Sequence, residues 1–172
     1  MRIAVGSDET TPLTDAVLAE LAARGHDVVL VGPPGGGTEG WAEVGRRVGE
    51  LVADGTCATG VLCCWTGTGV SIAANKVRGV RAALCGDAAT AAGARRWNDA
   101  NVLVMSLRAT SGPVAVEMLD AWFDTDADPA EAANVAMLEA SFLDGSGSAR
   151  GEPGPERPGG GAAVSGQLEG ER

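Results

Sequence analysis

Residues 60–76, Gly-Val-Leu-Cys-Cys-Trp-Thr-Gly-Thr-Gly-Val-Ser-Ile-Ala-Ala-Asn-Lys, are the most informative stretch for the fold class of this chain. The run begins with a wholly apolar segment that ends at Cys64, which is typical of a strand buried on both faces of a parallel sheet. Gly67 and Gly69 follow, and helical spacing of small and apolar residues begins at Val70. A strand, a Gly-rich loop and a helix in direct succession predict one unit of an α/β fold.

The same alternation extends over most of the chain. Good helix starts occur at Thr11-Pro12, at Asp87 and at Asp128-Pro129, where a capping side chain or a proline at the first helical position is present. We predict strands at 2–6, 27–31, 60–64, 80–84 and 102–105, and helices at 12–24, 41–53, 70–77, 88–97, 113–123 and 130–143. This pattern predicts a Rossmann-like three-layer α/β sandwich with a five-stranded parallel sheet, followed by a C-terminal helix.

The last part of the chain has a different composition. Residues 144–172 contain no aromatic residue, three prolines and a run of three glycines at 159–161. Such a stretch cannot bury enough apolar surface to offset the entropy of ordering it. We expect a folded domain over residues 1–143 and a disordered Gly/Pro-rich tail over residues 144–172.

The composition restricts the class of partner. The chain has 172 residues and a formal net charge of −10, from 13 Lys and Arg against 23 Asp and Glu. Nucleic acid and anionic membranes both require a cationic face, so a small solute or another protein is the expected partner. No apolar run approaches the ~20 residues of a membrane span, and the first residues do not resemble a signal peptide. We therefore expect a cytoplasmic protein.

The four cysteines, Cys57, Cys63, Cys64 and Cys85, form no CxxC pair. The single histidine, His26, lies far from them in sequence. This spacing predicts neither a metal site nor a disulfide framework, and no cofactor is expected. Side chains alternate along a strand, so Cys63 and Cys64 should point to opposite faces of the sheet.

The loop after Cys64 is the most informative of those at the carboxyl ends of the predicted strands, where parallel sheets bind ligands. Its glycines allow close approach of the backbone to a ligand, and the following helix start presents free N–H groups. These groups would lower the pKa of Cys64 and favour a thiolate that acts as base or nucleophile. A second interpretation is that Cys64 is a small buried apolar residue beside a tight turn. The spacing alone leaves both open.

Residues 60–76 closely resemble the active-site segment of the type B ribose-5-phosphate isomerases and the related galactose-6-phosphate isomerase subunits. Further similar stretches occur in the same order at 3–8, 79–85 and 98–103, and at Arg108. The resemblance covers roughly residues 1–123. It is specific, because the string from Ser71 to Lys76 matches as well as the glycines.

The resemblance implies an aldose–ketose isomerisation of a sugar phosphate without a metal. In this family an Asp after the first strand orients the sugar, which corresponds to Asp8. The loop cysteine, here Cys64, moves a proton between C1 and C2 through a cis-enediolate. Backbone amides of residues 66–69 would hold the enediolate oxygens, and Asn98 would contact substrate. One branch of the family uses a Glu after the last loop glycine, but this chain has Val70, so Cys64 is the expected base.

Three features depart from the family pattern. Glu9 occupies the position of a histidine, and Trp97 occupies that of the ring-opening histidine. No Lys, Arg or His lies between Arg108 and Arg150, where the family has the residues that clamp phosphate. Bidentate contacts from arginine are the main means by which proteins hold a phosphate dianion.

These departures leave four hypotheses. The first is an isomerase whose substrate has no phosphate, or a carboxylate or other head group, with Glu9 as acid or base and Trp97 stacked on the sugar or packed in the core. The second is a subunit of a heteromeric isomerase whose partner supplies the missing His and Arg residues. The third is a non-catalytic binding paralogue, and the fourth an ordinary ribose-5-phosphate isomerase.

The expected site combines the motif and its departures. Catalytic roles are predicted for Asp8, Glu9, Cys64 and Thr66, and substrate contacts for Ser7, Trp65, Gly67, Thr68, Gly69, Trp97, Asn98 and Arg108. The resemblance also implies a homodimer or homotetramer with sites at the subunit interface, or a hetero-oligomer.

Overall fold

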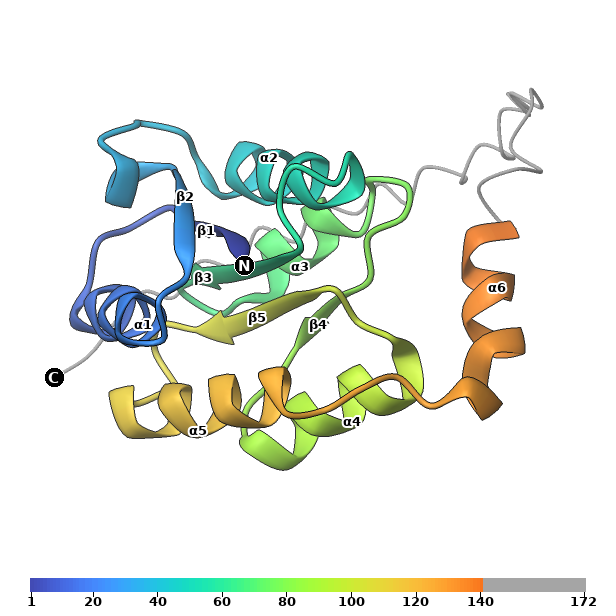
Figure 1. The fold of residues 1–172 in the computed structure, drawn as a ribbon. Coiled ribbons are helices and arrows are strands. Elements are labelled where there is room, and N and C mark those ends of the chain that lie inside the picture. Colours follow the sequence, from blue (N-terminus) through green and yellow to red (C-terminus); the bar gives the residue numbers. More distant parts are fainter. Residues whose placement is uncertain (141–172) are drawn as a thin grey trace, which may run out of the picture.

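The computed structural model describes residues 1–140, and a five-stranded parallel sheet forms its centre (Figure 1). The strands are β1 (Arg2–Ser7), β2 (Asp27–Val31), β3 (Thr59–Cys64), β4 (Ala82–Leu84) and β5 (Val102–Ser106). Their order across the sheet is β2-β1-β3-β5-β4, and every neighbouring pair is parallel. The predicted fold class is confirmed.

The helices are α1 (Pro12–Ala23), α2 (Trp41–Ala53), α3 (Thr68–Ala74), α4 (Ala88–Asn98), α5 (Gly112–Phe123) and α6 (Ala132–Ala140), with short 3₁₀ turns η1 (Pro33–Gly35) and η2 (Pro129–Glu131). Two helices, α1 and α4, begin at the expected capping residues Thr11 and Asp87. The Thr11 hydroxyl accepts a hydrogen bond from the Thr14 N–H, and the Asp87 carboxylate accepts one from the Thr90 N–H. These side chains satisfy N–H groups that a helix start would leave without partners.

The helices cover the sheet on both faces. Helices α1, α4 and α5 lie on one side, and α2 and α3 lie on the other (Figure 1). Alternation along the strands feeds both cores: Cys63 packs into the cluster under α1 and α5, and Cys64 into the cluster under α2 and α3. The prediction that the two cysteines face opposite ways is confirmed.

Some boundaries differ from those predicted. Helix α3 starts at Thr68, two residues earlier than expected, because Gly67 adopts a left-handed conformation (φ 78°) and serves as its N-cap. The fourth strand was predicted over 80–84, but β4 covers only Ala82–Leu84. The last helix was predicted from residue 130, but the 3₁₀ turn η2 comes first and α6 starts at Ala132. The predicted helix end near residue 143 and the predicted tail over 144–172 lie outside the described residues.

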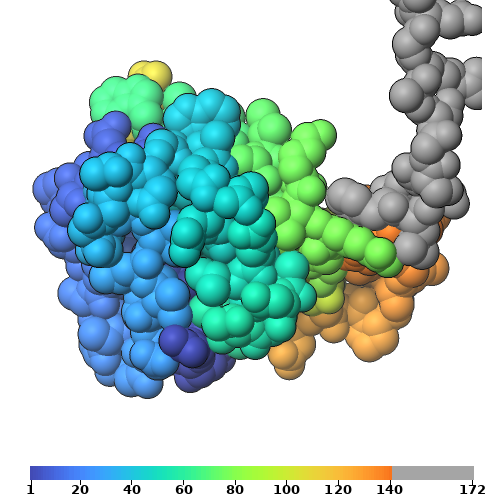
Figure 2. All heavy atoms as spheres, turned by 90° about the horizontal axis from the view of Figure 1, so that it is seen from above, coloured from blue at the N-terminus to red at the C-terminus, as the bar shows by residue number. Residues whose placement is uncertain are grey.

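Helix α6 stands apart from the three layers. It lies at one end of the molecule in Figure 1 and at the rim of the face that α2 covers in Figure 2. None of its residues is buried, and Met137 is 72% exposed. Within residues 1–140 no helix is long and apolar enough to cross a membrane.

Candidate active site

Two neighbouring strands bring Asp8 and Cys64 together at the carboxyl edge of the sheet. In the register of β1 and β3, Ser7 lies opposite Cys63, so the residues that follow, Asp8 and Cys64, end the two strands side by side. The Cys64 thiol donates a hydrogen bond to Asp8 Oδ2 at 3.6 Å. This pair is the centre of the candidate site.

The Asp8 carboxylate is only partly satisfied. Its Oδ1 atom is buried and has no hydrogen-bond partner within residues 1–140. A buried polar atom without a partner is costly, and such atoms are uncommon in native structures. Among the described residues, this oxygen is therefore left as an unused hydrogen-bond acceptor next to Cys64.

The pKa of Cys64 does not shift in the expected direction. The backbone N–H groups of Gly67 and Trp65 do lower it, as predicted. Burial of the side chain, which is 7% exposed, raises the pKa, and the negative charge and hydrogen bond of Asp8 raise it further. The net result is a raised pKa, so the prediction of a lowered one was wrong. The sequence could not show that Asp8 would lie against the sulfur.

The Gly-rich loop is held to the neighbouring strand end by its backbone. The N–H of Leu107 donates to the Cys64 carbonyl at 2.9 Å, and the N–H of Arg108 donates to the Trp65 carbonyl at 3.2 Å. The Ser106 hydroxyl also donates to the Trp65 carbonyl, at 2.9 Å. These three hydrogen bonds hold the start of the loop in place, and they occupy the carbonyl groups of Cys64 and Trp65.

Thr66 and Thr68 share a hydrogen bond of 2.8 Å between their hydroxyls on the exposed side of the loop. Thr66 also lines a hollow of about 280 Å³ together with Ser106 and Arg108. The Arg108 guanidinium forms no ion pair within residues 1–140. It is therefore a free cation next to the loop.

Ser7 and Glu9 differ in their surroundings. The Ser7 side chain is fully buried, and its hydroxyl accepts a hydrogen bond from the Glu9 N–H at 3.2 Å. This bond shapes the turn that carries Asp8. The Glu9 side chain is exposed beside it. The structure thus gives Ser7 a role in the backbone turn, while Glu9 lies open to a ligand.

Trp97 and Asn98 do not join this group within one chain. They end helix α4, which starts at the carboxyl edge and runs about 16 Å away from it. Trp97 is 55% exposed and packs against Gly93, and with Asn98 it lines a groove of about 510 Å³ that reaches Leu84 and Cys85. Leu84 and Cys85 also line the hollow that holds Arg108.

Trp41 is a neighbour of the site that the sequence did not reveal. It is the first residue of α2 and is 48% exposed. A Cβ placed on Gly69 would lie only 2.9 Å from the Trp41 ring, so the indole packs directly on the loop backbone. Nothing in the order of residues brings position 41 next to position 69; the contact arises because α2 and α3 pack side by side.

One residue of the Ser71–Lys76 segment, Asn75, holds α3 to the sheet by hydrogen bonds. The Asn75 side chain donates to the Ala82 carbonyl and accepts from the Ala82 N–H, both at 2.8 Å. The Asn75 amide thereby pairs with the outer edge of β4. Within residues 1–140 no cluster of three or more His, Cys, Asp and Glu side chains could hold a metal ion.

Comparison with known proteins gives consistent matches. Residues 3–138 match the family described as Ribose/Galactose Isomerase. The chain is 35% identical over 122 residues to ribose-5-phosphate isomerase B of Escherichia coli K12, which covers 70% of this chain and 82% of that protein. It is 33% identical over 130 residues to galactose-6-phosphate isomerase subunit LacB of Clostridium acetobutylicum, which covers 75% of each.

A solved structure agrees with these matches. Ribose-5-phosphate isomerase B of Clostridium thermocellum superimposes with a TM-score of 0.78 at 33% identity. The aligned part covers 84% of this chain and 99% of that one. The similarity therefore includes both the sequence and the arrangement of the elements.

Proposed function

Because the chain belongs to the ribose/galactose isomerase family, we propose that it interconverts an aldose and a ketose with Cys64 as the base. The observation that carries this proposal is the contact between the Cys64 sulfur and Asp8 at the end of two adjacent strands, beside a fixed Gly-rich loop. The unpartnered Oδ1 of Asp8 supports a role in holding a sugar hydroxyl.

The chemistry requires one base and one site for negative charge. The Cys64 thiolate removes the proton from C2 of the open-chain aldose, and the electron pair of that C–H bond forms the C1–C2 double bond of a cis-enediolate. As the C1–C2 double bond forms, the C1=O π bond breaks and its electron pair moves onto O1. The amides of residues 66–69 stabilise the enediolate oxygens. Return of the proton to C1, with a proton shift between the oxygens, gives the ketose. The proton lies α to a carbonyl, so no redox partner is needed.

We propose that the substrate is not ribose 5-phosphate. No Lys, Arg or His occurs between residues 108 and 150, and the acids Asp8 and Glu9 lie at the same edge as Cys64. Within residues 1–140 of one chain, a phosphate dianion beside the Gly-rich loop would meet one cation, Arg108, where phosphate sites usually provide several. A sugar with a neutral or otherwise different head group fits these charges better.

The site is proposed to lie between two copies of the chain. Trp97 and Asn98 are candidate substrate contacts, yet they lie at the far end of α4 from Cys64. The groove that they line continues to the exposed Leu84, next to the Arg108 hollow. A two-fold dimer across this edge would bring Trp97 and Asn98 of one copy towards Cys64 of the other.

A heteromeric subunit is a second candidate. The absence of cations between residues 108 and 150 favours it, because a paralogous partner could supply them. One relative of this chain, LacB, is itself described as a subunit of galactose-6-phosphate isomerase.

The experiment is a turnover assay of the purified chain over paired free and phosphorylated aldoses, including ribose 5-phosphate. We expect turnover of a non-phosphorylated sugar and a loss of about 10²-fold or more in Cys64→Ala. Cys63→Ala is the matched control, because it is the same substitution one residue away on the opposite face of β3.

Each other result decides against part of the proposal. Turnover that survives in Cys64→Ala excludes Cys64 as the base. A preference for ribose 5-phosphate overturns the substrate proposal. Activity that appears only with an added paralogue supports the heteromer, and sugar binding without turnover or solvent-proton exchange supports a non-catalytic protein.

A further inference from the structure

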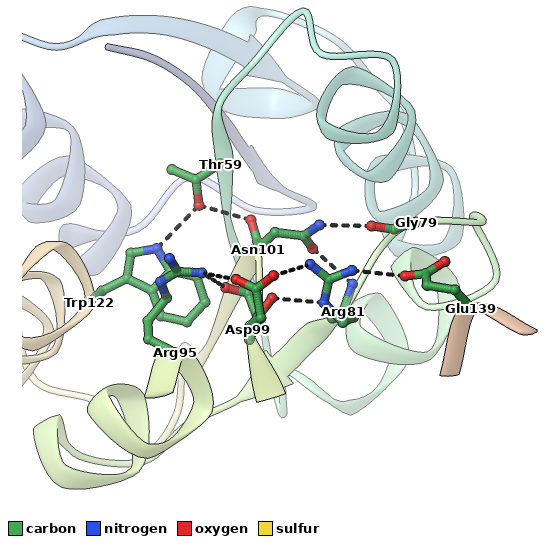
Figure 3. A network of polar contacts seen from close by, with 9 residues as sticks. Thr59, Gly79, Arg81, Arg95, Asp99, Asn101, Trp122 and Glu139 are labelled. Carbon is green, nitrogen blue, oxygen red and sulfur yellow. Dashed lines mark hydrogen bonds and ion pairs between the residues drawn. The ribbon is translucent and has the colours of Figure 1, made fainter. Parts of the chain in front are cut away.

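A polar network closes the end of the sheet opposite Cys64 (Figure 3). Thr59 and Asn101 lie at the starts of β3 and β5, and the Thr59 hydroxyl donates to the Asn101 carbonyl at 2.8 Å. The Asn101 side chain accepts from the Arg81 N–H and donates to the Gly79 carbonyl, both at 2.8 Å. Arg81 is therefore anchored by its backbone to the start of a central strand.

Asp99 is the residue of this network with an unusual backbone. It ends α4 with φ 43° and ψ 43°, and it is the one residue other than glycine with positive φ within residues 1–140. This conformation is unfavourable for residues other than glycine, although Asp tolerates it better than most. Asp99 follows directly after Asn98, so this conformation sets where α4 stops and where Asn98 lies.

The Arg81 guanidinium makes three hydrogen bonds, and two of them hold that turn. Its Nε donates to the Asp99 carbonyl at 2.8 Å and its Nη2 to the Asp99 carboxylate at 2.9 Å. Its Nη1 donates to the Glu139 carboxylate of α6 at 2.8 Å. The Arg81 side chain is only 17% exposed, so these bonds are screened less than surface ion pairs.

Arg95 completes the support. It donates to the other oxygen of the Asp99 carboxylate at 3.2 Å and to the Ala100 carbonyl, while its guanidinium lies over the Trp122 ring. Hydrogen bonds from two arginines, Arg81 and Arg95, thus stabilise the unfavourable left-handed backbone of Asp99. A surface turn that only had to end a helix would need much less, since a glycine at this position would suffice.

We propose that Arg81 and Asp99 are positioning residues that hold the Trp97–Asn98 end of α4 in place for contact with substrate. Glu139 ties α6 to the same guanidinium, so the position of α6 bears on the same turn. The inference rests on the proposed function, in which Asn98 serves the site of a second copy. In this role the Asp99 carboxylate does not touch substrate; it acts only by holding Asn98 in position.

The test is a double-mutant cycle between Asp99→Gly and Asn98→Ala on the full chain. Glycine keeps the left-handed backbone and removes only the carboxylate. We expect Asp99→Gly to lower kcat/KM about tenfold when Asn98 is present, and about twofold or less when Asn98 is already Ala. Arg81→Gln should behave in the same way, and Asp126→Asn, on an exposed acid outside this network, should have no effect.

A structural role alone predicts equal losses in both backgrounds, and that result would overturn the proposal. A second readout does not need turnover. The {¹H}–¹⁵N NOE of the Trp97 indole and the Asn98 side-chain amide should fall in Asp99→Gly and stay unchanged in Asp126→Asn. If no sugar turns over, the proposed function fails, but the NOE still tests the positioning role of Asp99. An unchanged NOE in Asp99→Gly would exclude that positioning role.

Discussion

At the scale of single residues, the carboxylate of Asp8 strongly affects the protonation of Cys64. Asp8 lies against the Cys64 sulfur, and its charge opposes that of a thiolate. Burial acts in the same direction, and together they exceed the effect of the loop amides on the pKa of Cys64. The resting site therefore holds a thiol, and the thiolate becomes available as the pH rises.

This arrangement predicts the pH dependence of Cys64. Removal of the Asp8 charge in Asp8→Asn removes both the repulsion and the hydrogen bond that favour the thiol, so the pKa of Cys64 should fall. We expect the midpoint of Cys64 alkylation by iodoacetamide, followed by peptide mass spectrometry, to move to lower pH.

Asp87→Asn is the control for this measurement. Asp87 is a second carboxylate after a strand end, but it caps α4 and does not act on the pKa of Cys64. Asparagine caps a helix about as well as aspartate, so the fold should be unaffected. Equal midpoints in Asp8→Asn and the wild type would contradict the assigned cause.

At the scale of elements, the loop between β3 and α3 depends on one glycine. Gly67 has φ 78°, and a Cβ there would lie 2.5 Å from the Leu84 side chain and 3.2 Å from the Met105 carbonyl. The loop therefore packs against the carboxyl ends of β4 and β5 and is also hydrogen-bonded to Ser106 and to the chain after β5. The conformation of the loop therefore depends on contacts with the sheet as well as on the loop's own residues.

Gly67→Ala should therefore cost more stability than a glycine replacement that meets only the backbone strain. Gly25 has a similar φ of 71°, and no atom lies within 4 Å of the place that an alanine methyl would take, so Gly25→Ala is the matched control. We expect Gly67→Ala to lose ~1–3 kcal/mol more of the free energy of unfolding in urea, together with most of the turnover. Equal losses would show that the contacts with Leu84 and Met105 carry no weight.

At the scale of the whole molecule, the candidate site is divided. Asp8, Cys64 and the loop lie at the carboxyl edge, whereas Trp97 and Asn98 lie at the other end of α4. Helix α6 stands beside that end with no buried residue and with Met137 and Leu138 exposed. The ion pair between Glu139 and Arg81 ties α6 to the same end of α4.

A composite site predicts complementation between two impaired variants. When Cys64→Ala and Asn98→Ala chains are unfolded together and refolded, about half of the dimers should be mixed, and each mixed dimer should hold one intact site. Turnover should recover to about a quarter of the wild-type value, well above the residual turnover of either variant refolded alone. Light scattering should give the mass of a dimer or larger assembly, and a lack of recovery would place all the residues of one site in one chain.

Much of this protein could be predicted from residue order. Local patterns predicted the five parallel strands, the caps at Thr11 and Asp87, and the opposite directions of Cys63 and Cys64. These features follow from side-chain alternation and from hydrogen bonds between residues close in sequence. The motif around Cys64 likewise identified the family, which the comparisons confirmed.

Only the tertiary structure decided how distant residues act on one another. The raised pKa of Cys64 comes from its burial and from Asp8, 56 positions earlier, and the indole on Gly69 comes from Trp41 on another helix. The separation of Asn98 from Cys64 and its support by Arg81 and Asp99 are also properties of the packed sheet. Electrostatic and packing effects depend on distances in space, and these are set only when the strands take their order in the sheet.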